Sequence, residues 1–455
     1  MKLLLKNLML LLVFLLLVTN SCKKNEDPSG NNLPDSVKTV NEFIYQNTID
    51  YYLWNEYIPA GIDINDYPDP YELFDAMYYP TLDYWSFVTD DYQGLLDNLN
   101  GIQVTEGYIM QLYKFQNSND LFGIIEYVYE GGPAANAGMK RGDVVLSVNG
   151  QTLNINNYTT LIPLSVKELG LGAIEGNEIV DKGITVTVTS AEMNINPVLQ
   201  YSVLEKGAKK IGYFLYDQFT DDVQVLEDVM NYFKGQNITD LVLDLRFNSG
   251  GYATTCDSLA AMMAPSSAIG STFLTQQWND GLTAYLIDEF GSQSDWFISK
   301  FPVVPVNLNL SRLYVLTSGR TASASESLVN GLAPYMDVFL IGDRTAGKYT
   351  GAWLLNDEIH PEDNWGLYLV TSKLANANGA TDFVNGFTPD YEILDDYITP
   401  LGDENELLFA KAISLITDSP VKSVRQSAFS NFQPVDKIYR NNMQKQGIMV
   451  LKTKN

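Results

Sequence analysis

The chain has 455 residues, of which 45% are apolar and 12% aromatic, enough to fill the cores of about three domains of ordinary size. Its formal net charge of −26 excludes a broad electrostatic affinity for nucleic acid or for anionic lipid. The single histidine, His360, excludes a metal site with two or more histidine ligands. Acid or base chemistry therefore falls mostly to carboxylates, lysine or tyrosine.

Residues 1–21 have the pattern of a secretory signal peptide. Lys2 and Lys6 precede an apolar run from Leu8 to Val18, which is too short to span a bilayer of ~30 Å comfortably. An uncleaved N-terminal anchor is the alternative. We therefore expect an exported protein.

Cys22 follows the signal directly, and a cysteine at this place resembles the lipid-attachment site of bacterial lipoproteins. The usual Leu three residues earlier is replaced by Thr19, so ordinary cleavage that leaves a free thiol is the other interpretation. The resemblance implies a protein anchored to the outer membrane through lipid on Cys22, on its periplasmic or cell-surface face. Residues 22–35 would then be a polar tether.

Residues 36–98 are predicted to form a small helical N-terminal domain. Residues 36–57 place apolar side chains at helical spacing, and a second helix begins near Pro70. This part is dense in aromatic residues such as Trp54 and Trp85. They could form a platform for carbohydrate or peptide, but the packing of helices explains them more simply.

Short β-like runs begin at about residue 102. Residues 131–153, GGPAANAGMKRGDVVLSVNGQTL, predict a one-turn helix ended by Gly138 and a strand from Val144 to Val148. The segment resembles the PDZ domain of bacterial proteases, over residues 102–192, and a generic β-hairpin with a helix is the alternative. The resemblance implies a peptide partner that is bound as an added strand. The candidate loop for its terminal carboxylate consists of Gly107, Tyr108, Ile109 and Met110.

Strand and helix signals alternate over residues 198–420, which predicts an α/β core entered through a link at residues 193–209. Leu241–Leu245 is a short buried strand, and Phe247–Gly251 is the turn beyond its carboxyl end, where ligands of open α/β sheets lie. Cys256 in the next helix is explained more simply as a small core residue than as a nucleophile. Residues 421–455 are predicted to be a C-terminal tail.

Ser323 has two compatible interpretations. With Glu326 it has the spacing of a capping box before an apolar helix. A serine at a helix N-terminus also lies where amides and the helix dipole stabilise an oxyanion. Lys348, just beyond the strand 338–341, is the natural base for that serine if burial lowers its pKa towards neutrality; a surface lysine in a turn is the alternative.

The turn Asn248-Ser-Gly-Gly251 could supply the oxyanion site. Two glycines after a buried strand usually make only a turn. They also let backbone amides approach a substrate carbonyl, so the amide of Gly250 or Gly251 and that of Ala324 would form a two-donor oxyanion hole.

Together the segments DLRFNSGG (244–251), TASASE (321–326) and GK (347–348) resemble the C-terminal processing peptidases, also called tail-specific proteases. This family of Ser/Lys endopeptidases carries a PDZ domain. The resemblance implies a crotonase-like ββα core, Ser323 as nucleophile, Lys348 as base, and no cofactor or metal. Residues 84–87, YWSF, are similar to a segment of its lipoprotein members. One departure is Ala352, where many members carry a Gln that orients the lysine.

The sequence therefore predicts a multidomain α/β protease that cleaves exported or extracellular proteins or peptides after PDZ capture of a chain terminus. Two alternatives stay open. The first is a catalytically inactive, peptide-binding lipoprotein. The second is a hydrolase that uses His360 as its base. The sequence leaves the natural substrate and the oligomeric state open.

Overall fold

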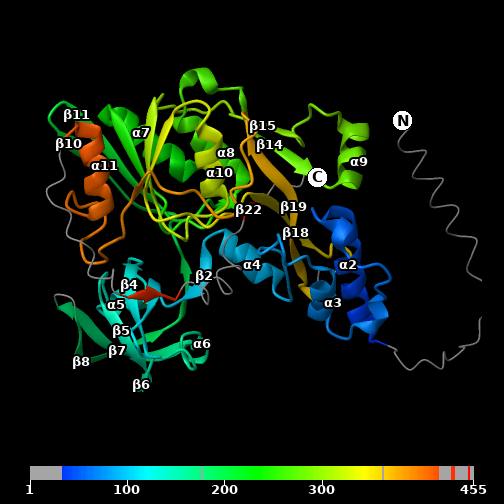
Figure 1. Ribbon diagram of the computed structural model, residues 1–455, viewed down its shortest axis with the longest axis horizontal. Coiled ribbons are helices and arrows are strands. Elements are labelled where there is room, and N and C mark those ends of the chain that lie inside the picture. Colours follow the sequence, from blue (N-terminus) through cyan, green and yellow to red (C-terminus); the bar gives the residue numbers. More distant parts are fainter. Residues whose placement is uncertain (1–32, 176–177, 361–362, 420–431, 436–448, 451–455) are drawn as a thin grey trace, which may run out of the picture.

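The computed structural model describes residues 33–175, 178–360, 363–419, 432–435 and 449–450. The predicted signal peptide, Cys22 and most of the predicted tether and tail lie outside the described residues. Figure 1 shows the α/β core above, with the N-terminal helices and a β-rich domain below it on opposite sides. Within the part of the chain that the structure describes, no helix is both long and apolar enough to span a bilayer.

The N-terminal domain packs its apolar side chains against two strands of the core. Tyr52, Trp54 and Phe74 share one buried cluster with Leu367 and Val370 of the core, so packing explains these aromatic residues. The helices are α2 (Asp35–Tyr51), α3 (Pro70–Met77) and α4 (Tyr92–Leu99), with short 3-10 turns at Asn55–Tyr57 and Ile64–Asp66 and the strand β1 (Phe87–Thr89).

The β-rich domain contains the elements predicted from its glycine and proline pattern. Pro133 opens the short helix α5 (Pro133–Asn136), Gly138 has φ +81°, and the predicted strand Val144–Val148 is β5. The sheet order is β21-β3-β4-β5-β7-β8, and β6 pairs with β5. The other strands are β3 (Tyr108–Lys114), β4 (Leu121–Val128), β6 (Gln151–Thr152), β7 (Val166–Glu175), β8 (Glu178–Thr189) and β21 (Gln433–Pro434), and the second helix is α6 (Tyr158–Leu161).

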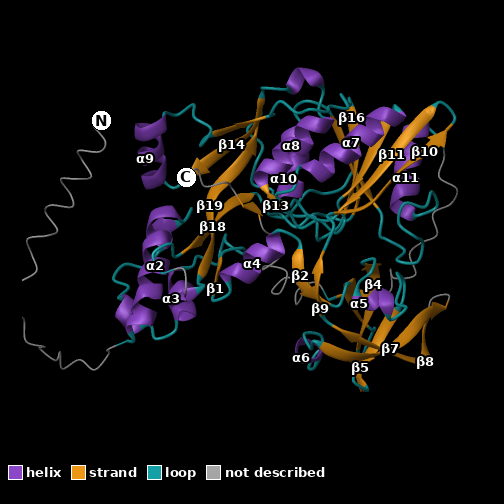
Figure 2. Ribbon diagram, turned by 180° about the vertical axis from the view of Figure 1, so that it is seen from behind, coloured by secondary structure: helices purple, strands orange, loops and turns teal. Residues whose placement is uncertain are grey.

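A separate two-stranded ribbon joins this domain to the rest of the chain. Strand β2 (Ile102–Thr105) enters the domain, and β9 (Ala191–Asn194) leaves it, paired antiparallel to β2. Figure 2 shows this ribbon between the β-rich domain and the core.

The core contains a mostly parallel sheet in the order β10-β11-β12-β16-β17-β20, in which only β10 and β11 run antiparallel. The predicted link at residues 193–209 is wrong in part, because β10 (Val198–Lys206) forms there and pairs along its length with β11. Its half-exposed side chains carry no strong sequence signal. The remaining strands are β11 (Lys209–Tyr216), β12 (Asp240–Asp244), β16 (Arg312–Thr317), β17 (Asp337–Gly342) and β20 (Tyr391–Glu392).

A second core sheet lies between the parallel sheet and the N-terminal helices, in the order β13-β22-β18-β19-β14-β15, with β1 paired to β19. Its strands are β13 (Gly251–Tyr252), β14 (Thr272–Trp278), β15 (Ile298–Lys300), β18 (Thr350–Asn356), β19 (Gly366–Asn376) and β22 (Met449–Val450). The core helices are α7 (Gln224–Gln236), α8 (Ala253–Met263), α9 (Asp280–Phe290), α10 (Ala324–Leu332) and α11 (Leu407–Thr417), with a 3-10 turn at Ser266–Ala268.

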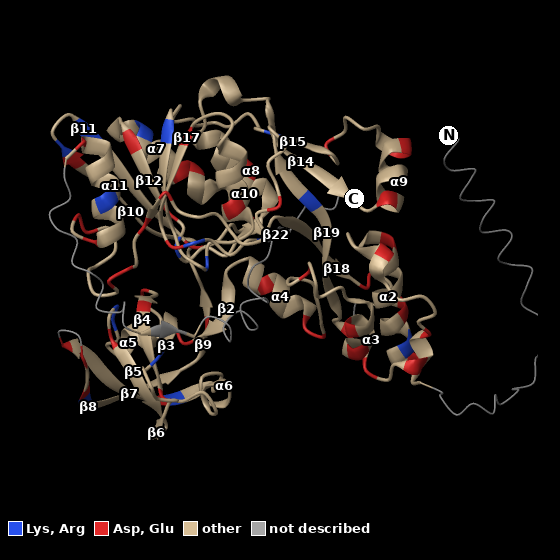
Figure 3. Cartoon of the chain, in the orientation of Figure 1, with Lys and Arg blue, Asp and Glu red and all other residues tan. Residues whose placement is uncertain are grey.

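Acidic residues are distributed over helices and loops of all three parts of the chain (Figure 3). Within the described residues, no group of three or more His, Cys, Asp or Glu side chains is arranged to hold a metal ion.

Candidate active site

Ser323 lies at the junction between the loop after β16 and helix α10. Its φ of +58° places it in a region that L-residues rarely adopt, and such strain concentrates at functional sites. The residue is fully buried, and its Oγ has no hydrogen-bond partner among the described residues. A buried hydroxyl without a hydrogen-bond partner lowers the free energy of unfolding, so stability does not explain the presence of this serine.

The carboxylate of Glu326 holds this loop and the lysine turn together. Its Oε2 accepts from the backbone N–H of Ser323 at 3.0 Å and from that of Lys348 at 2.8 Å. Its Oε1 accepts from Thr345 Oγ1 at 2.6 Å and from the Gly347 N–H at 2.7 Å. The capping-box spacing thus gave the Glu326 contact with Ser323 but missed its three partners beyond the helix.

Only glycine fits at position 347 in this turn. Gly347 has φ +94°, and a Cβ there would meet the Val384 carbonyl oxygen at 2.4 Å. The GK turn is therefore a backbone requirement, because any other residue would push Lys348 away from Glu326.

Lys348 is fully buried, as the chemistry of a lysine base requires. Burial lowers the pKa of Lys348 to about 7, against the opposing effects of the Asp83 and Glu326 carboxylates. Its Nζ donates to the Tyr368 hydroxyl at 2.5 Å. The same Nζ lies 5.2 Å from the centre of the Trp85 ring and 4.7 Å from that of Tyr368.

The predicted oxyanion turn lies beside the serine loop. Asn248 Oδ1 accepts from the Ser325 hydroxyl at 2.9 Å, and the Asn248 carbonyl accepts from the Ala322 N–H. Asn248 Oδ1 also accepts from the Gly250 N–H at 2.9 Å, so this amide donates within the turn, and the oxyanion role of Gly250 stays a prediction. A side chain that turns back onto the backbone two residues later is a common use of Asn.

Gly251 and Ala324 stay as the candidate donors. Gly251 has φ +137°, and a Cβ there would meet the Phe219 carbonyl oxygen at 2.1 Å, so only glycine allows this approach. Ala324 is the first residue of α10, where a backbone N–H has no intrahelical acceptor.

A cavity of about 190 Å³ connects the β-rich domain to this turn. Tyr108, Ile109 and Met110 of the β-rich domain line it, and so do Ser249, Gly250 and Gly251 of the core. The structure thus brings the predicted peptide-binding loop and the predicted oxyanion turn to one cavity. Gly107, Ser323 and Lys348 do not line it.

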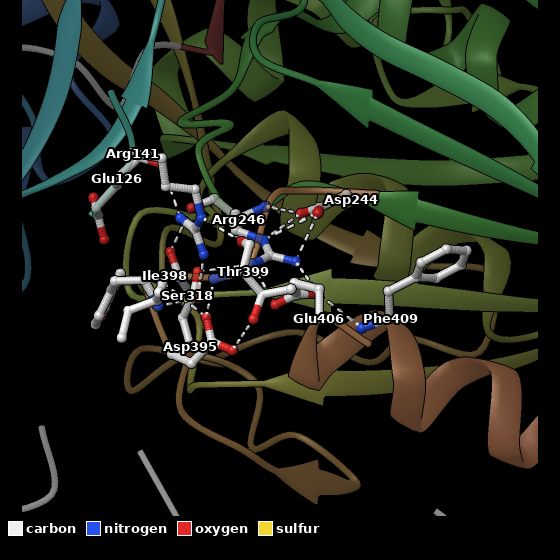
Figure 4. Close-up of polar contacts among 12 residues, drawn as sticks. Glu126, Arg141, Asp244, Arg246, Ser318, Asp395, Ile398, Thr399, Glu406 and Phe409 are labelled. Carbon is white, nitrogen blue, oxygen red and sulfur yellow. Dashed lines mark hydrogen bonds and ion pairs between the residues drawn. The ribbon is translucent and has the colours of Figure 1, made fainter. Parts of the chain in front are cut away.

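A buried ionic network holds the strand end that precedes the oxyanion turn (Figure 4). Arg246 pairs with Asp244 at 2.8 Å, with Asp395 at 2.7 Å and with Glu406 at 3.0 Å. Asp395 also pairs with Arg141 of the β-rich domain. Although burial acts in the other direction, Arg141 and Arg246 hold the pKa of Asp395 at about 2.

Two other candidate groups lie in different surroundings. His360 is 41% exposed, and its Nδ1 lies 3.0 Å from Asp357. Because Ser323 Oγ has no hydrogen-bond partner among the described residues, this serine makes no contact with His360 of the kind that the His360 alternative requires. Cys256 is fully buried in the main core cluster, in agreement with a packing role.

The sequence interpretation missed Asp83 and Tyr368. Both are fully buried polar residues that lie near Lys348, one from the N-terminal domain and one from β19. The YWSF segment was the available signal, because Trp85 and Phe87 belong to the same group of side chains.

Comparison with protein-family models gives three matches along the chain. Residues 210–393 match Peptidase family S41, residues 39–87 match the Peptidase S41 N-terminal domain, and residues 124–164 match the PDZ domain. The first match lies in the core, the second in the N-terminal domain and the third in the β-rich domain.

Individual relatives agree with these matches. A carboxyl-terminal-processing protease of a Picosynechococcus strain is 26% identical over 322 residues, covering 69% of this chain and 72% of that protein. A chloroplastic C-terminal processing peptidase of Tetradesmus obliquus is 24% identical over 283 residues, covering 59% of this chain and 56% of that protein.

Solved structures show the same fold. A putative S41 protease of Bacteroides fragilis superposes with a TM-score of 0.67 at 26% identity, covering 83% of this chain and 97% of its own. The photosystem II D1 C-terminal processing protease superposes with a TM-score of 0.50 at 18% identity, covering 84% and 99% of the two chains.

Proposed function

This chain belongs to peptidase family S41, a family of serine-type peptidases with a PDZ domain, and from that premise we propose that Ser323 is its nucleophile and Lys348 its general base. One observation carries the proposal: one oxygen of Glu326 accepts the backbone N–H groups of both residues, and both are fully buried. A lysine in such surroundings gives up its proton near neutral pH, which a base for a serine hydroxyl must do.

In the proposed reaction, neutral Lys348 takes the proton of Ser323 as Oγ attacks the peptide carbonyl. The amides of Gly251 and Ala324 donate to the oxyanion of the tetrahedral intermediate. Lys348 then gives the proton to the leaving amine, which leaves an acyl group on Ser323 Oγ. Water then attacks that ester while the same lysine takes its proton, and the lysine returns this proton to Ser323 Oγ as the C–O bond breaks and the carboxylic acid leaves.

The resting structure has no hydrogen bond between Ser323 Oγ and Lys348 Nζ. Catalytic contacts are often loose before substrate binds and tighten in the complex. We therefore infer that the Ser323 side chain rotates towards Nζ when a peptide enters.

The test is cleavage of an unfolded protein such as reduced casein by the full chain. We expect Ser323→Ala to abolish cleavage, and Ser258→Ala, which removes a hydroxyl bonded only within α8, to keep it. Wild-type protein that is folded but cleaves nothing would favour the alternative of an inactive peptide-binding protein.

We further propose that the PDZ domain captures a substrate chain end at the cavity shared with the oxyanion turn. Tyr108, Ile109 and Met110 lie there at the start of β3, and PDZ domains bind a free carboxylate on backbone amides at such a loop. A fluorescent peptide with a free carboxyl terminus should bind more tightly than its amidated form. Equal affinity for the two would contradict carboxylate capture.

Export and lipid anchoring at Cys22 complete the proposal. The signal-like residues 1–21 and the cysteine that follows support it. Cys22→Ser should release the protein from the membrane fraction of a host that processes lipoproteins, and unchanged membrane association would contradict lipidation.

A further inference from the structure

The pocket of Lys348 is built by two parts of the chain that are distant in sequence. Strand β1 of the N-terminal domain pairs with β19 of the core so that Phe87 is opposite Tyr368. The two rings stack with centres 5.3 Å apart. Trp85, two residues before Phe87, covers Lys348 Nζ from the same segment. The N-terminal domain is therefore a wall of the lysine pocket.

Tyr368 contacts Lys348 within the cluster that contains Ala352. Ala352 and Tyr368 are both fully buried and belong to one cluster between β18, β19 and the N-terminal helices. The small side chain of Ala352 fills little of this space, and the phenol of Tyr368 provides the polar atom that contacts Nζ at 2.5 Å. One N–H of Lys348 is thereby fixed, which limits the directions in which its lone pair can point.

Asp83 is the acidic group of the N-terminal wall. Its Oδ2 accepts from the Tyr52 hydroxyl at 2.9 Å, and its Oδ1 accepts from the N–H groups of Trp85 at 2.8 Å and Ser86 at 3.0 Å. Burial raises the pKa of Asp83, while these hydrogen bonds favour its charged form. Asp83 acts electrostatically on Lys348, and its segment reaches the lysine through Trp85, whose ring centre lies 5.2 Å from Nζ.

The titratable groups around Lys348 are Asp83 from the N-terminal domain, Glu326 from α10 and Tyr368 from β19. The two oxygens of Glu326 accept hydrogen bonds from four donors. One of these donors is the backbone N–H of Lys348, and none is its side-chain nitrogen. The side-chain nitrogen itself contacts the Tyr368 hydroxyl and lies over the Trp85 ring.

We propose that Tyr368 is the positioning residue of Lys348, in the role that Gln has in related motifs, and that Asp83 of the N-terminal domain controls the protonation of this lysine. The proposal rests on the proposed function, because it assigns partners to the proposed base. It makes the N-terminal domain part of the catalytic apparatus: its Asp83 tunes a base that the core carries.

Tyr368→Phe tests the positioning role, since it keeps the ring and removes only the hydroxyl. We expect kcat for a peptide substrate to fall by about 10²-fold, the scale of a misplaced general base, while KM changes by less than about twofold. Tyr335→Phe is the matched control, because it removes a hydroxyl that donates to the Thr272 carbonyl. A kcat within about twofold of wild type in a folded Tyr368→Phe protein would overturn the role.

Asp83→Asn tests the control of protonation. Removing a nearby negative charge should lower the pKa of Lys348, so the rising limb of the pH profile of kcat/KM should move to lower pH by about one unit. Asp90→Asn, an exposed change in the same domain, should leave the limb in place. A limb that stays or moves to higher pH in Asp83→Asn would overturn the proposal.

Tyr52→Phe gives a second variant if Asp83→Asn does not fold. It removes one hydrogen bond that favours the charged form of Asp83, so the limb should move in the same direction by a smaller amount. If the rising limb of the kcat/KM profile keeps its pH position in both folded variants, Asp83 does not control the protonation of Lys348. Wild-type protein that neither cleaves casein nor reacts with a fluorophosphonate would instead show that the proposed function itself fails.

Discussion

Ser323 and Lys348 donate their backbone N–H groups to the same oxygen of Glu326, at 3.0 and 2.8 Å. The two nitrogens therefore cannot be farther apart than the sum of those two distances. A helix cap and a glycine turn are joined through one buried carboxylate. We regard this joint acceptor as the feature that makes a Ser/Lys site of two otherwise ordinary motifs.

Glu326→Gln should damage both stability and activity. An amide presents its NH₂ group to one of the N–H or O–H donors that the carboxylate now accepts, so at least one buried donor loses its partner. We expect a loss of about 3 kcal/mol or more in the free energy of unfolding by urea, and a large fall in kcat. The control is Glu289→Gln on the exposed face of α9, and equal stability of the two variants would contradict this account.

Lys348→Met should remove activity and raise stability. The unfolded lysine binds a proton up to its ordinary pKa near 10.5, whereas the folded one releases it above about 7. The buried lysine therefore lowers the free energy of unfolding of the wild type by an amount that grows as pH falls from about 10 to 7. Below pH 7 this destabilisation stays constant.

The measurement is urea unfolding of both proteins across this pH range. Methionine should add about 1–2 kcal/mol at pH 7, with an advantage that shrinks towards pH 10. Lys300→Met, at an exposed position, should show no such trend. A less stable Lys348→Met protein at pH 7 would mean that the lysine is a structural cation.

Arg246→Lys should destabilise the fold although the charge is kept. Lysine cannot reproduce the guanidinium contacts with Asp244, Asp395 and Glu406, so buried carboxylates would lose their partners. We expect a loss of about 3–5 kcal/mol, against no measurable change for the exposed Arg344→Lys.

The same network predicts a pH dependence. The pKa of Asp395 is depressed to about 2, so its stabilising contribution is present above the ordinary value of 3.8 and is lost as pH falls towards 2. Acid unfolding of Asp395→Asn should lack that component. An unchanged acid transition would show that Asp395 is not held by its two arginines.

Strand β22 lies between β13 and β18 in the second core sheet, and we predict that a substrate strand competes with it for this place. Met449 pairs in parallel with Gly251 of β13, and Val450 pairs with Ala352 of β18, so this segment lies between the oxyanion turn and the strand that follows Lys348. Proline has no backbone N–H and is poorly tolerated inside a β-sheet, so Val450→Pro should weaken this pairing. We expect Val450→Pro to raise kcat/KM for a peptide several-fold, and an unchanged or lower value would show that the segment does not compete with substrate.

Local patterns predicted the parts of the site that local chemistry determines. The strand at Leu241–Leu245, the helix after Ser323 and the turn at Lys348 follow from apolar runs, a cap and glycines. The burial of Lys348 also agreed with the requirement that its pKa be low.

Contacts between distant segments could not be predicted in the same way. Asp83 comes near Lys348 through the pairing of β1 with β19, and Tyr368 through the pairing of β19 with β18, the strand that follows Lys348. No periodicity in these segments specifies either pairing. The hydrogen bond from the Gly250 N–H to Asn248 has a local cause, the Asn248 side chain two residues earlier, and the NSG sequence could have indicated it.

The most direct test of the account is covalent labelling of the full chain by a fluorophosphonate, with the adduct located by mass spectrometry at a series of pH values. We predict one adduct on Ser323, a labelling rate that rises through pH about 7 as Lys348 becomes neutral, and loss of labelling in Lys348→Met. An adduct on Ser325, or a Lys348→Met protein that labels as fast as wild type, would contradict the Ser323–Lys348 pair.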